Sequence, residues 1–151
     1  TSIEEYAFSE CSSLKQITIP SSVTKIGYSA FMNCSSLEQI TMPALLTSIE
    51  AGTFQSCCSL KQINIPSSVT IINDEAFYNC KSLIHISLSS SLISIGDHSF
   101  ENCSSLIEIN IPSSVTSIGK SVFIGCTLLS QVSIPSSVKD IGSHAFKNAH
   151  H

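Results

Sequence analysis

The chain has 151 residues, of which 42% are hydrophobic and 12% are charged, and its formal net charge is −4. This length suits one domain. The net charge is negative, and the basic residues are lysines without any arginine, which argues against a nucleic-acid surface, since such a surface needs a dense basic patch. The apolar residues are spread along the chain without an uninterrupted run of about 18, so a membrane span within it is not expected.

A repeat of 23 residues runs through the whole chain. Its unit reads L-x-x-I-x-I-P-S-S-V-x-x-I-G-x-x-A-F-x-x-C-S-S, and more than six periods pass without insertion or deletion. Phenylalanine holds one position of every unit, cysteine follows three residues later in six units, and leucine follows six residues later. The phenylalanines are Phe8, Phe31, Phe54, Phe77, Phe100, Phe123 and Phe146.

The first element of a unit is a short strand, as the copy at 14–36 illustrates. Its run 14–19 alternates apolar and polar residues and places Ile17 and Ile19 on one face. This alternation in β-forming residues predicts a half-buried strand. Pro20 ends the strand, because proline has no N–H for the ladder.

The second part of the unit is more compact. After a Ser-Ser turn, the run 23–26 predicts a second short extended segment with Val23 and Ile26 facing inward. Gly27 suits a corner with positive φ. The spacing of alanine, phenylalanine and cysteine within 28–37 predicts one helical or 3₁₀ turn.

One unit cannot bury its own apolar side chains, but identical coils stacked about 4.8 Å apart cover one another and pair their strands. Equal coils place like residues above like, so phenylalanine, leucine, isoleucine and cysteine each form a column. The period therefore predicts a β-rich solenoid of 23-residue coils, built from short strands and 3₁₀ or helical turns.

The unit resembles the BspA-like (Treponema-type) leucine-rich repeats, because IPSSVTSIG is followed by AF-x-x-C-x-x-L. This resemblance covers residues 3–148 and implies a right-handed leucine-rich-repeat solenoid. It also implies a cell-surface or secreted protein with roles in adhesion to a host or matrix. The asparagine that the best-known repeats carry just past the strand is replaced here by Ser-Ser, so its hydrogen-bond ladder is not expected.

We expect a single solenoid over 1–149, with about six and a half repeats. The chain begins in the middle of a repeat and lacks a secretory signal or evident capping modules, which suggests a segment of a longer protein. Membrane contact would then arise only through other segments of that parent. His150 and His151 resemble the start of a purification tag, and we leave them out of the functional argument.

Seven cysteines in such a chain raise the alternative of a disulfide framework. Six of them occupy one column without a pairing pattern, so we expect buried thiols that act as small hydrophobic residues. Cys58 stands where other units have serine, lysine or threonine. We expect it to face solvent, as a candidate for oxidation or intermolecular linkage.

The sequence favours neither catalysis nor a metal or cofactor. His85, His98 and His144 occupy different columns or distant coils, so no convergent ligand set is expected. The serines are turn positions of the repeat, and no nucleophile elbow or phosphate loop appears. Asn33 and Asn102 begin N-C-S sequons, which are either glycosylation sites or by-products of the repeat.

The outward positions of the first strand are the candidate ligand-binding residues. They form two columns of amides and hydroxyls that suit hydrogen bonding to protein or glycan, although a solvated β face has the same composition. One column is Gln16, Gln39, Gln62, His85, Glu108 and Gln131, and the other is Thr18, Thr41, Asn64, Ser87, Asn110 and Ser133.

Four isoleucines stand where other units have polar residues. Ile84 and Ile107 precede the first strand, and Ile71 and Ile93 follow the valine column. Exposed isoleucines in neighbouring coils would indicate hydrophobic contact with a partner. If these four are exposed, the middle and late coils are the favoured partner site.

Together these observations predict a non-enzymatic binding scaffold, namely an adhesin segment that binds a host or matrix protein or a glycan. A structural spacer and an intracellular protein-interaction scaffold remain the alternatives. Open strand edges at the end coils also make end-to-end self-association an expectation.

Overall fold

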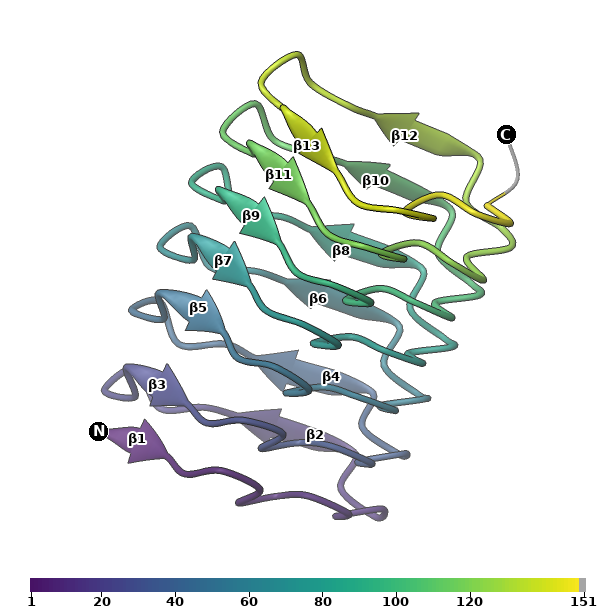
Figure 1. The fold of residues 1–151 in the computed structure, drawn as a ribbon. Helices are drawn as coiled ribbons and strands as arrows, with labels where there is room; N and C mark the ends of the chain where they lie inside the picture. The colour runs from purple at the N-terminus through teal and green to yellow at the C-terminus, as the bar shows by residue number, and fades with distance from the viewer. Residues whose placement is uncertain (150–151) are drawn as a thin grey trace.

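The computed structural model describes residues 1–149, which form one stack of coils with the N- and C-terminal coils at opposite ends (Figure 1). Thirteen short strands and no helix occur among these residues, and hence no helix that could cross a membrane. The strands are β1 (Ser2–Ile3), β2 (Gln16–Thr18), β3 (Lys25–Ile26), β4 (Gln39–Thr41), β5 (Ser48–Ile49), β6 (Gln62–Asn64), β7 (Ile71–Ile72), β8 (His85–Ser87), β9 (Ser94–Ile95), β10 (Glu108–Asn110), β11 (Ser117–Ile118), β12 (Gln131–Ser133) and β13 (Asp140–Ile141).

The strands form two faces of the stack, and all their pairings are parallel and in the register of the repeat (Figure 1). The three-residue strands β2, β4, β6, β8, β10 and β12 make one face, on which Gln16 lies opposite Gln39. The two-residue strands make the other, where β5, β7, β9, β11 and β13 form a continuous sheet. The offset between paired residues is the 23-residue period, so each coil repeats the path of the one before it.

A column of phenylalanine rings runs through the core and confirms the expected stacking. Neighbouring rings have centroids 5.1–5.7 Å apart and interplanar angles of 2–21°. The five inner rings, from Phe31 to Phe123, are completely buried. The inward residues of both strand types also lie as expected, since Ile19, Val23 and Ile26 are buried.

The cysteine column is buried from Cys34 to Cys126 and half-buried at Cys11, and all seven cysteines are free thiols. Each inner thiol donates to the phenylalanine carbonyl of the coil before it, as from Cys57 Sγ to Phe31 O at 3.2 Å. Cys80 makes the same contact with Phe54 at 3.1 Å. Cysteine therefore fills a small apolar space and also provides a weak donor for a buried carbonyl.

Serine hydroxyls link successive coils at the Pro-Ser-Ser turns. Ser114 Oγ donates to the carbonyl of Leu92 at 2.6 Å, and Ser137 Oγ donates to Val115 at 2.8 Å. These bonds satisfy turn carbonyls that point at the neighbouring coil. The second serine of the turn thus provides an inter-coil hydrogen-bond ladder in place of asparagine.

The prediction of a positive-φ corner at Gly27 is wrong, because Gly52 and Gly125 are the only glycines with positive φ. Close approach between coils explains the glycine instead. A Cβ added to Gly27 would lie 2.6 Å from the backbone nitrogen of Glu5, and one on Gly96 would lie 2.6 Å from that of Asp74. At these two glycines a side chain would force the neighbouring backbone to shift, whereas the coils between them accommodate Glu50 and Asn73 at the same position.

The helical or 3₁₀ turn expected before each leucine is replaced by consecutive β-turns. In the second coil the amide of Met32 donates to Ser29 O, and the amide of Cys34 donates to Phe31 O. Two positions of every coil adopt positive φ, for example Ser29 (50°) and Asn33 (60°). These left-handed residues reverse the chain and prevent a continuous helix.

Candidate binding surface

The twelve candidate ligand-binding residues lie together on one exposed face. We call this the long-strand face, defined by Gln16, Thr18, Gln39, Thr41, Gln62, Asn64, His85, Ser87, Glu108, Asn110, Gln131 and Ser133. All twelve are exposed, because they flank an inward central residue in each strand. The strand pairing aligns them in two columns along the stack. Their role in binding remains a prediction.

Three shallow hollows follow this face. The largest, of about 660 Å³, is lined by residues that include His85, Glu108 and Gln131. A second, of about 520 Å³, is lined by Gln39 and Gln62 among others, and a third of about 450 Å³ lies between them. A ligand on this face would therefore contact several coils at once.

The long-strand face offers mainly hydrogen-bond donors and acceptors. Its two titratable side chains approach each other, with His85 Nδ1 and Glu108 Oε1 3.8 Å apart. Both side chains are 59% exposed, so this contact is too open to contribute much stability. No group of histidine, cysteine and carboxylate side chains within 1–149 is arranged to hold a metal ion. The other ten residues of the long-strand face carry amides or hydroxyls.

The four isoleucines divide into three exposed residues and one that is half-buried. Ile71, Ile93 and Ile107 expose 40%, 49% and 44% of their surface. Ile84 is half-buried, so the condition of exposure holds for three of the four residues; Lys61 and Ile107 hold its position in the neighbouring coils. Ile107 and Ile84 adjoin the long-strand face, whereas Ile71 lies in β7 on the opposite face.

Cys58 is half-buried rather than fully solvent-facing. Its Sγ lies 3.7 Å from the carbonyl oxygen of Asn79 in the next coil, which accepts its thiol proton. The two sequon asparagines differ, since Asn33 is exposed and Asn102 is half-buried. Both adopt positive φ, as Asn79 and Asn148 do, so the turn itself accounts for asparagine at this position.

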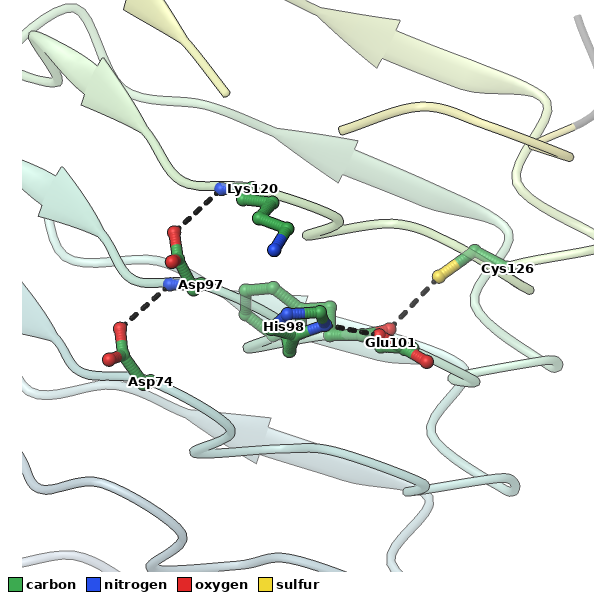
Figure 2. Close-up of polar contacts among 7 residues, drawn as sticks. Asp74, Asp97, His98, Glu101, Lys120 and Cys126 are labelled. Carbon is green, nitrogen blue, oxygen red and sulfur yellow. Dashed lines mark hydrogen bonds and ion pairs between the residues drawn. The ribbon is translucent and has the colours of Figure 1, made fainter. Parts of the chain in front are cut away.

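A second set of polar contacts, which the sequence analysis missed, lies at the far end of the short strands (Figure 2). Asp74 Oδ1 accepts the backbone N–H of Asp97 at 2.8 Å, and Asp97 Oδ1 accepts that of Lys120 at 2.7 Å. Beside this ladder, His98 Nδ1 lies 2.5 Å from Glu101 Oε2. The available signal was aspartate at the same repeat position in two successive coils.

Comparisons with known proteins show the repeat family of the chain. The model of the BspA type leucine rich repeat region matches residues 1–74 and 47–151, with six copies of the repeat. A search of curated proteins found no match.

Solved structures of such proteins share the fold. The leucine rich repeat protein of T. pallidum is 32% identical over 97% of this chain and 69% of its own, with a TM-score of 0.93. A leucine-rich repeat protein from Bacteroides ovatus is 34% identical over 98% of this chain and 44% of its own, with a TM-score of 0.75. A leucine rich cell surface protein from Faecalibacterium prausnitzii is also 34% identical over 98% of this chain and 48% of its own, with a TM-score of 0.74.

This chain therefore spans about two thirds of the first of these proteins and less than half of the other two. The family match covers all its repeats, and proteins of this kind are typically non-enzymatic scaffolds that bind other proteins. The chain belongs to the BspA-type leucine-rich repeat family.

Proposed function

We propose that this chain is a segment of a cell-surface adhesin whose long-strand face binds a host or matrix protein or a glycan. The observation that carries the proposal is the unbroken array of twelve exposed polar residues, only two of which are titratable side chains. Stacked coils fix their spacing, so many weak hydrogen bonds can form together without ordering a flexible loop. The cell-surface relative from F. prausnitzii supports the same location.

End-to-end association of solenoids is a further part of this proposal. Ile134 and Ile141 of the last coil are exposed by 43% and 50%, whereas their counterparts in the preceding coil, Ile111 and Ile118, are buried. A second coil stacked on them would cover these side chains as each inner coil covers the next.

The adhesin proposal predicts that the triple variant Gln39→Ala, Gln62→Ala and Asn64→Ala loses affinity without losing stability. Each truncated side chain removes about one hydrogen bond worth roughly 0.5–1.5 kcal/mol, so the dissociation constant should rise by at least about tenfold. The measurement is surface plasmon resonance against the ligand found in a screen of immobilised matrix proteins and glycans.

A matched control carries Thr24→Ala and Thr47→Ala, two exposed positions on the opposite face. It should bind as the unmodified protein does, and both variants should retain its circular dichroism and melting temperature. If the triple variant binds with unchanged affinity, the long-strand face is not the site, and a spacer role is favoured.

A further inference from the structure

Two isoleucines on the short-strand face, Ile71 and Ile93, are exposed to solvent. Ile71 pairs with Ser48 and Ser94, which hold the same position in the adjacent coils. Ile93 lies next to Thr70, the residue before Ile71, because its amide donates to Thr70 O at 2.8 Å. Other coils have threonine or lysine at the position of Ile93. Because neighbouring coils fold with polar residues at these positions, the apolar side chains need another explanation.

Two carboxylates lie just beyond these isoleucines, at a position held by Glu5, Tyr28, Ala51, Lys120 and Ser143 in other coils. Asp74 and Asp97 each use one oxygen to accept a backbone amide of the following coil (Figure 2). This contact fixes the carboxylate, and the second oxygen of each has no hydrogen bond among the described residues. A held carboxylate can bind a cation without first being ordered.

The same two coils line two separate hollows, and the residues that follow Asp74 and Asp97 in one of them, Glu75 and His98, line the other. One, of about 340 Å³, is lined by Ile71, Asp74 and Asp97 among others. The other, of about 370 Å³, is lined by Gln55, Glu75, Tyr78, His98 and Glu101.

Four of the eleven acidic residues of the chain therefore gather in two neighbouring coils. We call Ile71, Asp74, Glu75, Ile93, Asp97 and Glu101 the acidic patch.

We propose that the acidic patch is a second docking surface, for an extended segment of a partner protein that carries apolar side chains next to lysine or arginine. The isoleucines would cover the apolar side chains, and the fixed carboxylates would pair with the cations. Charge complementarity selects this occupant, because Asp74, Glu75 and Asp97 make no ion pair among the described residues. Glu101 is already held by His98, and the ladder continues to a single lysine, Lys120. This surface is separate from the long-strand face and does not depend on the function proposed for it.

The test uses fluorescein-labelled hexapeptides and fluorescence anisotropy with the full chain. A peptide that alternates leucine and lysine should bind. Peptides with serine for leucine, or glutamate for lysine, should bind at least about tenfold more weakly, because each lacks one of the two complementary features. If the serine–lysine peptide bound as tightly as the leucine–lysine peptide, the patch would attract cations in general and the proposal would be overturned. No binding of the leucine–lysine peptide would overturn it as well.

Two protein variants locate the site. Ile71→Ser with Ile93→Thr restores the residues of neighbouring coils, and Asp74→Asn with Asp97→Asn keeps the oxygen that accepts the backbone amide, so both should melt as the unmodified protein does. Each should weaken binding of the leucine–lysine peptide by about tenfold. Glu108→Gln, which removes a carboxylate from the long-strand face, should leave that binding unchanged.

Equal loss in Glu108→Gln and in the patch variants would contradict a defined site. Sedimentation velocity of the protein alone tests whether a second copy of the chain occupies the patch instead. Self-association that the Ile71→Ser, Ile93→Thr variant abolishes would make the occupant a second copy and overturn the peptide assignment. A monomer, or self-association through the end coils that this variant retains, supports it.

Discussion

Replacing Phe77 with alanine should lower the free energy of unfolding by about 3–5 kcal/mol. The ring is completely buried and stacks between Phe54 and Phe100, with centroid distances of 5.4 and 5.3 Å. Its removal leaves a cavity that adjacent coils cannot close, because their spacing is set by strand pairing. Urea unfolding followed by circular dichroism measures the change.

Tyr28→Ala is the matched control for this variant. Tyr28 is also aromatic, but it is 44% exposed and contacts Tyr6 edge-on at the surface. Its removal should cost less than about 1 kcal/mol. A Phe77 variant that is no less stable than the Tyr28 variant would mean that the phenylalanine column is not the core.

Alkaline pH should unfold the protein through its buried thiols. Burial raises the pKa of Cys34 to about 11 and that of Cys126 to about 12, and it raises the pKa of Cys57, Cys80 and Cys103 well above the usual value. In the unfolded chain these thiols ionise near pH 8.5. The folded state retains their protons, so stability is fully present below about pH 8.5 and falls as pH rises toward the folded pKa values.

The free energy of unfolding should fall steeply with pH above about pH 8.5. Each thiol contributes about 1.4 kcal/mol per pH unit, and five together contribute about 7 kcal/mol per unit. Since a domain is stable by about 5–15 kcal/mol, unfolding is expected within roughly two units above pH 8.5. Urea titrations in reductant at a series of pH values give this slope directly.

The double variant Cys80→Ala with Cys103→Ala serves as the comparison for the alkaline slope. It should lose two fifths of the slope whatever its stability at neutral pH, because two of the five raised thiols are gone. A slope that does not change would assign the alkaline effect to other groups.

The sequence was sufficient to predict the stack because the repeat leaves one way to bury its apolar residues. Phenylalanine at a strict interval of 23 residues could only form a column once the coils were equal, and the alternation of Gln16, Ile17 and Thr18 fixed which side chains faced outward. Both inferences depend on local pattern and period alone, which a single chain displays directly.

The turns were mispredicted because they depend on contacts between coils. Gly27 was interpreted from its own backbone freedom, but the backbone of Glu5 in the preceding coil excludes a side chain there. Asparagine recurs at the position of Asn33 because the backbone there is left-handed. The asparagines at equivalent positions in the sequence already indicated this geometry.

The binding surfaces were predicted unevenly for a related reason. Exposure of the long-strand face follows from strand alternation, whereas the half-burial of Ile84 depends on the length of the side chains in adjacent coils. The Asp74–Asp97 ladder also needs the register of two coils before the amide that each carboxylate accepts can be identified. Departures from the repeat mark such sites, but only the stacked structure shows what they contact.

The central claim is that each 23-residue coil folds by stacking on its neighbour in register, and deletion of one period tests it most directly. Removing residues 72–94 joins equivalent positions of two coils, so the shortened protein should keep its circular dichroism spectrum and a single cooperative urea transition. Removing 72–83 breaks the period and should abolish that transition. Cooperative folding of the second deletion, or unfolding of the first to the same extent as the second, would contradict the account.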